Sequence, residues 1–156
     1  MQISNKFRIA IASDHAGFSL KESIKKYLDK LGFEVEDFGT YSEESVDYPD
    51  FAVKVAEALK NKKFERGILI CGTGIGMSIS ANKVPGIRAA LCYNTKTAKL
   101  SREHNDANIL TLGGRMIGEK EAKRIVDVWL KTKSLGERYL RRVEKINKID
   151  DNYRKH

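Results

Sequence analysis

Residues 67–76, G-I-L-I-C-G-T-G-I-G, decide the fold of this chain. The run 67–71 is short and apolar, which is typical of a strand buried on both faces of a parallel sheet. The run 72–76 alternates glycine with other residues and precedes a helix-forming stretch. It therefore predicts a tight strand-to-helix turn whose backbone N–H groups can face an anion. Strand, turn and helix in this order are the building unit of an α/β fold.

The same pattern recurs on both sides of this segment. Short apolar runs predict further strands, and apolar residues spaced by three and four predict the helices between them. Ser19 and Glu22 match a capping box for the first helix. We expect strands at 7–13, 33–38, 67–71, 87–93 and 109–112, and helices at 19–31, 49–59, after the glycine turn, 95–102, 121–130 and 134–149, with a frayed tail from about Asp150.

This alternation predicts an α/β fold in a single domain, residues 1–156. Right-handed crossovers place helices on both faces of the sheet, so we expect a three-layer α/β/α sandwich of the Rossmann-like type with about five parallel strands. The strand order stays open. The last helix is rich in charge and short of apolar positions for a core-facing stripe, so we expect it to reach a partner subunit.

Composition excludes several classes of protein. The chain is 41% apolar and 32% charged, which fits an ordinary globular domain. Cys71 and Cys92 are too few for a disulfide framework, and no Cys/His cluster has metal-ligand spacing. There is no apolar run long enough to span a bilayer and no signal-peptide segment at 1–8. We therefore expect a cytoplasmic protein, without a metal, and Cys92 in the core.

The net charge of +8 is concentrated near the C-terminus. Residues 120–156 hold 12 Lys and Arg against 6 Asp and Glu. Such a surface favours an anionic partner. Nucleic acid, an anionic membrane and a phosphorylated small molecule all fit this charge.

Polar side chains follow the predicted strands. In open parallel sheets the ligand crevice lies beyond the carboxyl ends of the strands, so these side chains are candidate site residues. A thiol, two histidines, carboxylates and an arginine are expected to converge there. The candidates are Asp14 and His15, Asp47 and Tyr48, Cys71, His104 to Asp106, and Arg115.

The glycine turn does not match the common nucleotide-binding loops. A dinucleotide site needs G-x-G-x-x-G and an acidic residue about 20 positions later, whereas Leu91, Cys92 and Tyr93 occupy that region. The Gly-Lys-Ser/Thr of a Walker A loop is absent. We therefore expect no nucleotide cofactor.

Five motifs together resemble one known family. They are S-D-H-A-G (13–17), V-D-Y-P-D (46–50), C-G-T-G-I-G-M-S-I-S-A-N-K (71–83), G-I-R-A-A (86–90) and R-E-H-N-D-A-N (102–108). In this order they resemble the ribose-5-phosphate isomerase B family, which also includes galactose-6-phosphate and allose-6-phosphate isomerases. The resemblance covers nearly the whole chain.

The resemblance implies interconversion of D-ribose 5-phosphate and D-ribulose 5-phosphate, a step of the pentose phosphate pathway, through an enediolate and without metal or cofactor. Cys71 matches the general base, and Met77 stands where another branch has a glutamate. His104 matches the residue that opens the sugar ring. Other matched positions are Thr73 and Asn105 at the reacting end, Asp14 and Tyr48 at the sugar, and Gly72, Gly74, Ile75 and Gly76, whose amides would stabilise the oxyanion.

The resemblance also implies a phosphate site shared between subunits. Its matched residues are His15, Arg115, Arg138 and Arg142. The two C-terminal arginines, four residues apart on one helical face, would cross the interface of a homodimer or of a tetramer. The family commonly has G-x-R-H here, but this chain has Tyr139 in place of the histidine.

Alternative interpretations remain. A hexose 6-phosphate such as allose or galactose 6-phosphate is the nearest alternative substrate, and a non-catalytic phosphosugar-binding protein is another class. A nucleic-acid binder is disfavoured because no recognition motif is present. Taken singly, Cys71 could be a small buried hydrophobe, and the arginines could form a solvated helix face.

Overall fold

The computed structural model describes residues 7–154. Within that range the elements alternate as expected, and the α/β fold is confirmed. Their bounds are β1 Arg8–Ser13, α1 Phe18–Lys30, β2 Glu34–Asp37, α2 Tyr48–Lys60, β3 Arg66–Cys71, α3 Ile75–Ala81, β4 Ala89–Leu91, α4 Thr95–Asn105, β5 Ile109–Gly113, α5 Glu119–Lys131 and α6 Arg138–Tyr153.

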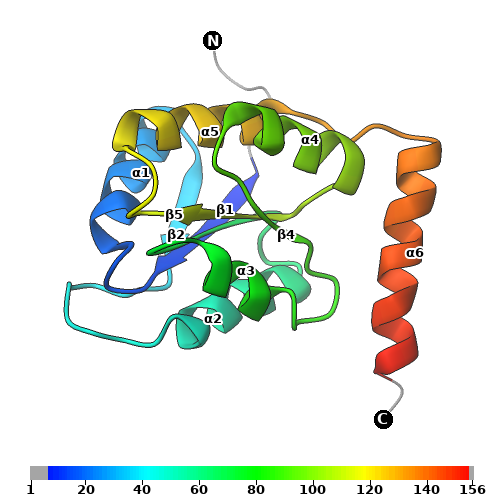
Figure 1. Ribbon diagram of the computed structural model, residues 1–156, viewed down its shortest axis with the longest axis horizontal. Coiled ribbons are helices and arrows are strands. Elements are labelled where there is room, and N and C mark those ends of the chain that lie inside the picture. Colours follow the sequence, from blue (N-terminus) through cyan, green and yellow to red (C-terminus); the bar gives the residue numbers. More distant parts are fainter. Residues whose placement is uncertain (1–6, 155–156) are drawn as a thin grey trace.

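The strands form one parallel sheet in the order β2-β1-β3-β5-β4. α1, α4 and α5 cover one face, and α2 and α3 cover the other (Figure 1). Since side chains alternate along a strand, β3 sends Ile68 and Ile70 into the first core and Leu69 and Cys71 into the second. α6 stands to one side of these layers and packs on α4 (Figure 1).

Several boundaries differ from the predictions, including the start of α1, the length of β4 and both ends of α6. The capping box is wrong: α1 begins at Phe18 after Gly17, with no side-chain cap, because the turn before it is pressed onto β3, where a Cβ on Gly17 would clash with the Ile70 carbonyl. β4 spans three residues rather than 87–93. α6 continues to Tyr153 instead of fraying at Asp150, whose carboxylate accepts the Gly86 N–H at 2.8 Å.

A buried ion pair ties α1 to the end of β2. Lys21 Nζ is fully buried and donates to both carboxylate oxygens of Asp37 at 2.7 Å and to the Thr40 carbonyl at 2.6 Å. Lys25 donates to the same carboxylate at 2.8 Å. Burial pushes the pKa of Asp37 up, but the hydrogen bonds from both lysines and from the Gly39 N–H hold that pKa below its ordinary value.

Among the helices of residues 7–154, none combines the length and apolar character that crossing a bilayer requires. Nor do the His, Cys, Asp and Glu side chains of this range gather in threes or more around a point that could hold a metal ion.

Candidate active site

The candidate residues form two groups at opposite ends of the strands, and the end at which the strands finish is called the carboxyl edge. The carboxyl-edge group surrounds the carboxyl ends of the strands and consists of Asp14, His15, Tyr48, Cys71, Gly72, Thr73, Gly74, Ile75, Gly76 and Arg115. The α6-side group consists of His104, Asn105, Arg138 and Arg142.

Cys71 is the last residue of β3 and is only 4% exposed. Its Sγ accepts a hydrogen bond from the Gly74 N–H at 3.1 Å. Gly74 has a φ of +83°, and a Cβ there would lie 2.6 Å from Leu91 Cδ1 and 2.9 Å from the carbonyl carbon of Leu112. Only glycine therefore fits the turn that brings this amide to the sulfur. The Gly74 N–H thus fixes the sulfur at the start of the glycine turn.

Two backbone N–H groups of the glycine turn already donate hydrogen bonds to atoms of the same chain. The Ile75 N–H donates to Thr73 Oγ1 at 3.2 Å, and the Tyr93 hydroxyl donates to the Thr73 carbonyl at 2.7 Å. The Gly74 and Ile75 amides thus bind chain atoms in this structure. The amides of Gly72 and Gly76 are the better candidates for holding an oxyanion.

Asp14 and His15 lie in the turn after β1. Asp14 is 6% exposed, and its Oδ1 accepts the Gly17 N–H at 3.0 Å. His15 Nδ1 accepts the Val46 N–H at 3.1 Å. The neutral imidazole must therefore carry its proton on Nε2, which is then a donor for a ligand.

Tyr48 and Arg115 complete the carboxyl-edge group. The Tyr48 ring lies against Gly76, where a Cβ would clash with it. Arg115 follows β5, and its side chain passes Gly72, with Cδ 3.5 Å from where a Cβ on that glycine would be. The Arg115 N–H donates to the Gly72 carbonyl at 3.0 Å. Tyr48 and Arg115 thus lie against the glycine turn that follows Cys71.

His104 and Asn105 are not at that edge, which corrects the expectation from the sequence. They end α4, and a crossover helix returns the chain to the amino ends of the strands. The register pairs Gly67 with Ile109 and Cys71 with Gly113. The amino and carboxyl ends of these strands therefore lie about 13 Å apart. Within one chain, His104 therefore does not join Cys71.

The α6-side group is organised around Tyr139, the residue that stands in place of the histidine of the family pattern. The imidazole of His104 stacks on the Tyr139 ring, with centroids 4.5 Å apart and planes 1° from parallel. Arg138 Nη2 donates to the Tyr139 hydroxyl at 2.9 Å. The guanidinium carbons of Arg138 and Arg142 lie 4.9 and 6.0 Å from the ring centroid. His104 and the two arginines thus meet.

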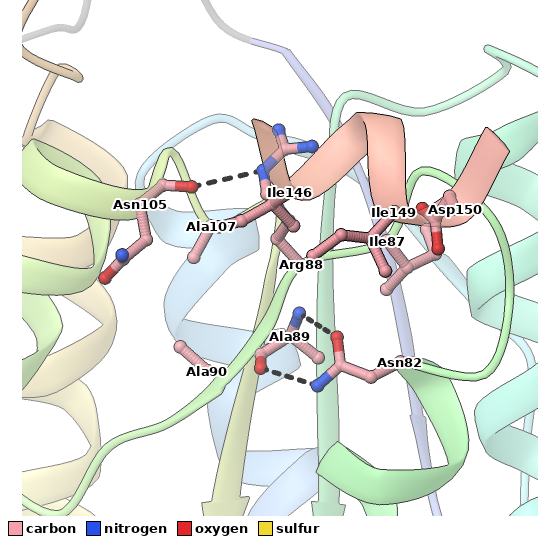
Figure 2. Close-up of a pocket in the computed structure, with 10 residues that line it drawn as sticks. All are labelled: Asn82, Ile87, Arg88, Ala89, Ala90, Asn105, Ala107, Ile146, Ile149 and Asp150. Atoms are coloured by element: carbon pink, nitrogen blue, oxygen red, sulfur yellow. Dashed lines mark hydrogen bonds between the residues drawn. The ribbon is translucent and has the colours of Figure 1, made fainter. Parts of the chain in front are cut away.

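A pocket of about 370 Å³ lies beside Asn105, between α6 and β4 (Figure 2). Asn105 accepts the Arg88 Nε–H on its carbonyl at 3.1 Å. Burial lowers the pKa of Arg88, and the charge of Asp106 partly offsets that effect. On the free side of β4, the Asn82 amide donates to the Ala89 carbonyl at 3.0 Å and accepts the Ala89 N–H at 2.8 Å (Figure 2). Apolar side chains, including Ile87, Ile146 and Ile149, line the rest.

Comparison with known proteins places this geometry in a family. Residues 9–146 match the model of the family described as Ribose/Galactose Isomerase. The chain belongs to the ribose/galactose isomerase family. A putative sugar phosphate isomerase of Bacillus subtilis is 50% identical over 92% of this chain and 97% of its own length. Ribose-5-phosphate isomerase B of Escherichia coli is 49% identical over 92% of this chain and 96% of its own.

Solved structures of the family agree with the fold. Ribose-5-phosphate isomerase B of Clostridium thermocellum superposes with a TM-score of 0.92 at 58% identity, covering 94% of this chain and 99% of that one. The enzyme of Mycoplasma genitalium with bound ribulose-5-phosphate gives a TM-score of 0.88 at 45% identity, covering 92% and 96%. The resemblance drawn from the five motifs is confirmed.

Proposed function

We propose that the protein is an aldose-ketose isomerase that interconverts D-ribose 5-phosphate and D-ribulose 5-phosphate. The observation that carries this proposal is the likeness over 92% of the chain to the Mycoplasma genitalium isomerase with bound ribulose-5-phosphate. It would act in the cytoplasm, as a step of the pentose phosphate pathway, on a free phosphosugar. Neither nucleic acid nor a membrane would be a partner, and the reaction would need no metal or cofactor.

In the proposed reaction, the Cys71 thiolate removes the proton from C2 of the open aldose and returns it to C1. The proton of the C2 hydroxyl passes to the oxygen on C1, so that C2 becomes the new carbonyl carbon as C1 is protonated. The electron pair of the broken C–H bond forms the enediolate, whose charge collects on the former carbonyl oxygen. Donors that already point at that oxygen stabilise this charge without rearranging. The amides of Gly72 and Gly76 and the hydroxyl of Thr73 fill this role, while Asp14 and Tyr48 bind sugar hydroxyls. Asn105 belongs to the α6-side group and would line the reacting end from a second copy of the chain.

The opposite placement of the two groups supports a site shared between two copies of the chain. A homodimer would bring the α6-side group of one copy to the carboxyl-edge group of the other, and a two-fold axis would repeat the arrangement. The surfaces are complementary in character. Ile75 and Ile79 on α3, next to the Cys71 turn, are 48% and 58% exposed, and the pocket beside Asn105 is largely apolar. Pairing of two such dimers would give a tetramer.

In that dimer the partner's copy of His104 would open the sugar ring, and the partner's copies of Arg138 and Arg142 would bind phosphate together with His15 and Arg115. Phosphate binding at a distance from the reacting carbons holds C1 and C2 in place during proton transfer.

The test is a turnover assay with ribose 5-phosphate, allose 6-phosphate and galactose 6-phosphate in parallel, with EDTA present. We expect the pentose phosphate to have the highest kcat/KM. Preference for a hexose phosphate would reassign the substrate, and binding of all three without turnover would make the protein a phosphosugar-binding protein. Loss of activity in EDTA that a divalent ion restores would contradict metal-free catalysis.

A further inference from the structure

Tyr139 contacts His104 through its ring and Arg138 through its hydroxyl, and it lies close to Arg142. Its ring face meets the His104 imidazole at 4.5 Å, and its hydroxyl accepts from Arg138 at 2.9 Å. Arg142 lies 6.0 Å from the same ring centroid. One side chain therefore links the residue proposed to open the sugar ring to those proposed to bind phosphate.

The contact with His104 fixes the plane of the imidazole. In the part of the chain that the structure describes, neither ring nitrogen of His104 has a hydrogen-bond partner, in contrast to His15 Nδ1, which is occupied by the Val46 N–H. A half-buried histidine without such a partner turns freely about its terminal torsion. The parallel stack on Tyr139 restrains that turn and leaves both nitrogens free for substrate.

The contact with Arg138 acts on the guanidinium. The phenolic oxygen accepts one N–H of Arg138, and four donors of the guanidinium remain for an anion. The phenolic proton is not used in this hydrogen bond, so it can be donated to the same anion.

We infer that Tyr139 is a positioning residue with two separable parts. Its ring holds His104 for opening of the cyclic sugar, and its hydroxyl holds Arg138 for the phosphate. Ring opening moves the proton of the anomeric hydroxyl to the ring oxygen as the C1–O bond breaks, so no atom is gained or lost. The inference rests on the proposed function and adds to it a residue that does not touch the reacting carbons.

Two substitutions separate the parts. Tyr139→Phe keeps the ring and removes the hydroxyl, whereas Tyr139→Leu removes both. Tyr153→Leu makes the same change at the other end of α6, where the side chain is 83% exposed, and serves as the control. For each protein, kcat and KM are measured with ribose 5-phosphate, and deuterium incorporation from D₂O into C1 is measured with saturating ribulose 5-phosphate, whose chain is already open.

We expect Tyr139→Leu to lower kcat for ribose 5-phosphate by about tenfold to a hundredfold, since a misplaced catalytic group costs this much. Its deuterium incorporation should stay near that of the unaltered protein, because that step needs Cys71 and not His104. Tyr139→Phe should keep kcat and raise KM about threefold to tenfold, as expected for a weakened hydrogen bond to a charged group. Tyr153→Leu should change neither.

Three results would overturn the inference. In the first, Tyr139→Leu keeps the kcat of the unaltered protein. In the second, it slows deuterium incorporation as much as turnover, which indicates general damage to the site. In the third, Tyr139→Phe lowers kcat as much as Tyr139→Leu, which assigns the effect to the hydroxyl. Failure of the unaltered protein to turn over ribose 5-phosphate would instead refute the proposed function.

Discussion

At the scale of single residues, the two site histidines are held in different ways. His15 is fixed by a hydrogen bond to Nδ1 and offers Nε2–H as a donor. His104 is fixed by ring stacking and offers both nitrogens. A donor with one fixed direction suits binding of a static phosphate, and a ring with two free nitrogens suits proton transfer between two oxygens.

His15 can be tested through this geometry. His15→Asn can still accept the Val46 N–H with its amide oxygen but loses the donor at Nε2, whereas His15→Gln reaches the Nε2 position and loses the contact with Val46. We expect His15→Asn to raise KM by the equivalent of about 1.5–3 kcal/mol and His15→Gln to raise it less. The reverse order in steady-state kinetics would show that holding the 46–48 segment is what His15 contributes.

Cys71 is expected to carry the C–H step. Cys71→Ala should still bind ribose 5-phosphate but exchange its C2 hydrogen with solvent about 10²- to 10⁴-fold more slowly, the usual contribution of a general base. Cys92→Ala removes the other buried thiol, which is 1% exposed, and should leave the exchange rate unchanged. NMR in D₂O measures both. Exchange in Cys71→Ala at the rate of the unaltered protein would move the base elsewhere, with Asp14 as the next candidate.

Most residues at the carboxyl edge were predictable because they lie at or just after the end of a strand, whereas Tyr48 begins α2, well after β2 ends. Parallel strands end at one edge, so Asp14, Cys71 and Arg115 had to meet there whatever the strand order. His104 was misplaced because it follows a strand only after a complete helix, which carries the chain back. The stack with Tyr139 was not predictable, since nothing in the spacing of residues 104 and 139 brings α4 and α6 together.

At the scale of elements, the turn from β3 to α3 depends on one glycine. Gly74→Ala puts a side chain at positive φ and against Leu91 and the Leu112 backbone. It should lower the free energy of unfolding by about 1–3 kcal/mol and also reduce kcat, because the amide moves away from Cys71. Urea unfolding and steady-state kinetics measure the two effects. Gly118→Ala, which has open space and a φ of −80°, is the control and should cost less, namely the loss of a favourable N-cap residue of α5 without backbone strain.

The link between α1 and β2 should make stability depend on pH. A carboxyl whose pKa is lower in the folded state than in the unfolded chain stabilises the fold above its ordinary value, near 3.8 for Asp37. That stabilisation is lost as the pH falls through the lowered value. Lys21→Met leaves a buried carboxylate without its main partner and should cost about 3–5 kcal/mol at neutral pH.

Lys25→Met is the matched control, because its side chain is 31% exposed and contacts the same carboxylate. It should cost less than about 1 kcal/mol. Urea denaturation at pH 7 and between pH 3 and 5 measures these differences. Equal losses for the two lysines, or a stability that does not fall in acid, would contradict the assignment.

Element boundaries were predicted less well than element types. β4 is shorter than its apolar run because it is an edge strand, paired on one side only with β5. α6 runs over Arg138–Tyr153 instead of 134–149, and tertiary contacts of Asp150 and Arg154 with the 83–86 segment hold its C-terminal end. Such contacts between distant segments leave no local signal.

At the scale of the whole molecule, the proposed sharing of the site between subunits predicts complementation between two inactive variants. In a mixed dimer of Cys71→Ala and Arg142→Ala chains, one site carries both changes and the other carries neither. Equal co-expression should therefore restore about a quarter of the normal activity, and purified mixed dimers should have about half. Mixed dimers isolated with two affinity tags provide the measurement. No recovery in proven mixed dimers would place both residues in one chain's site.

The fold class was predictable from the repetition of strand, turn and helix, because only a parallel sheet with helices on both faces accommodates it. The order β2-β1-β3-β5-β4 was not, since every strand is a similar apolar run and other orders satisfy the same pattern. That topology places the candidate residues at two ends of the strands. The sequence predicted this separation from Cys71 for Arg138 and Arg142 but not for His104.

The amide of Asn82 occupies the hydrogen-bonding groups of Ala89 on the free side of β4. An uncovered edge would let a strand from another molecule continue the sheet, which is the first step toward fibrils. Here a side chain takes the place of that strand. At Ala89, the free edge of β4 therefore has no backbone group left to pair with a strand of another molecule.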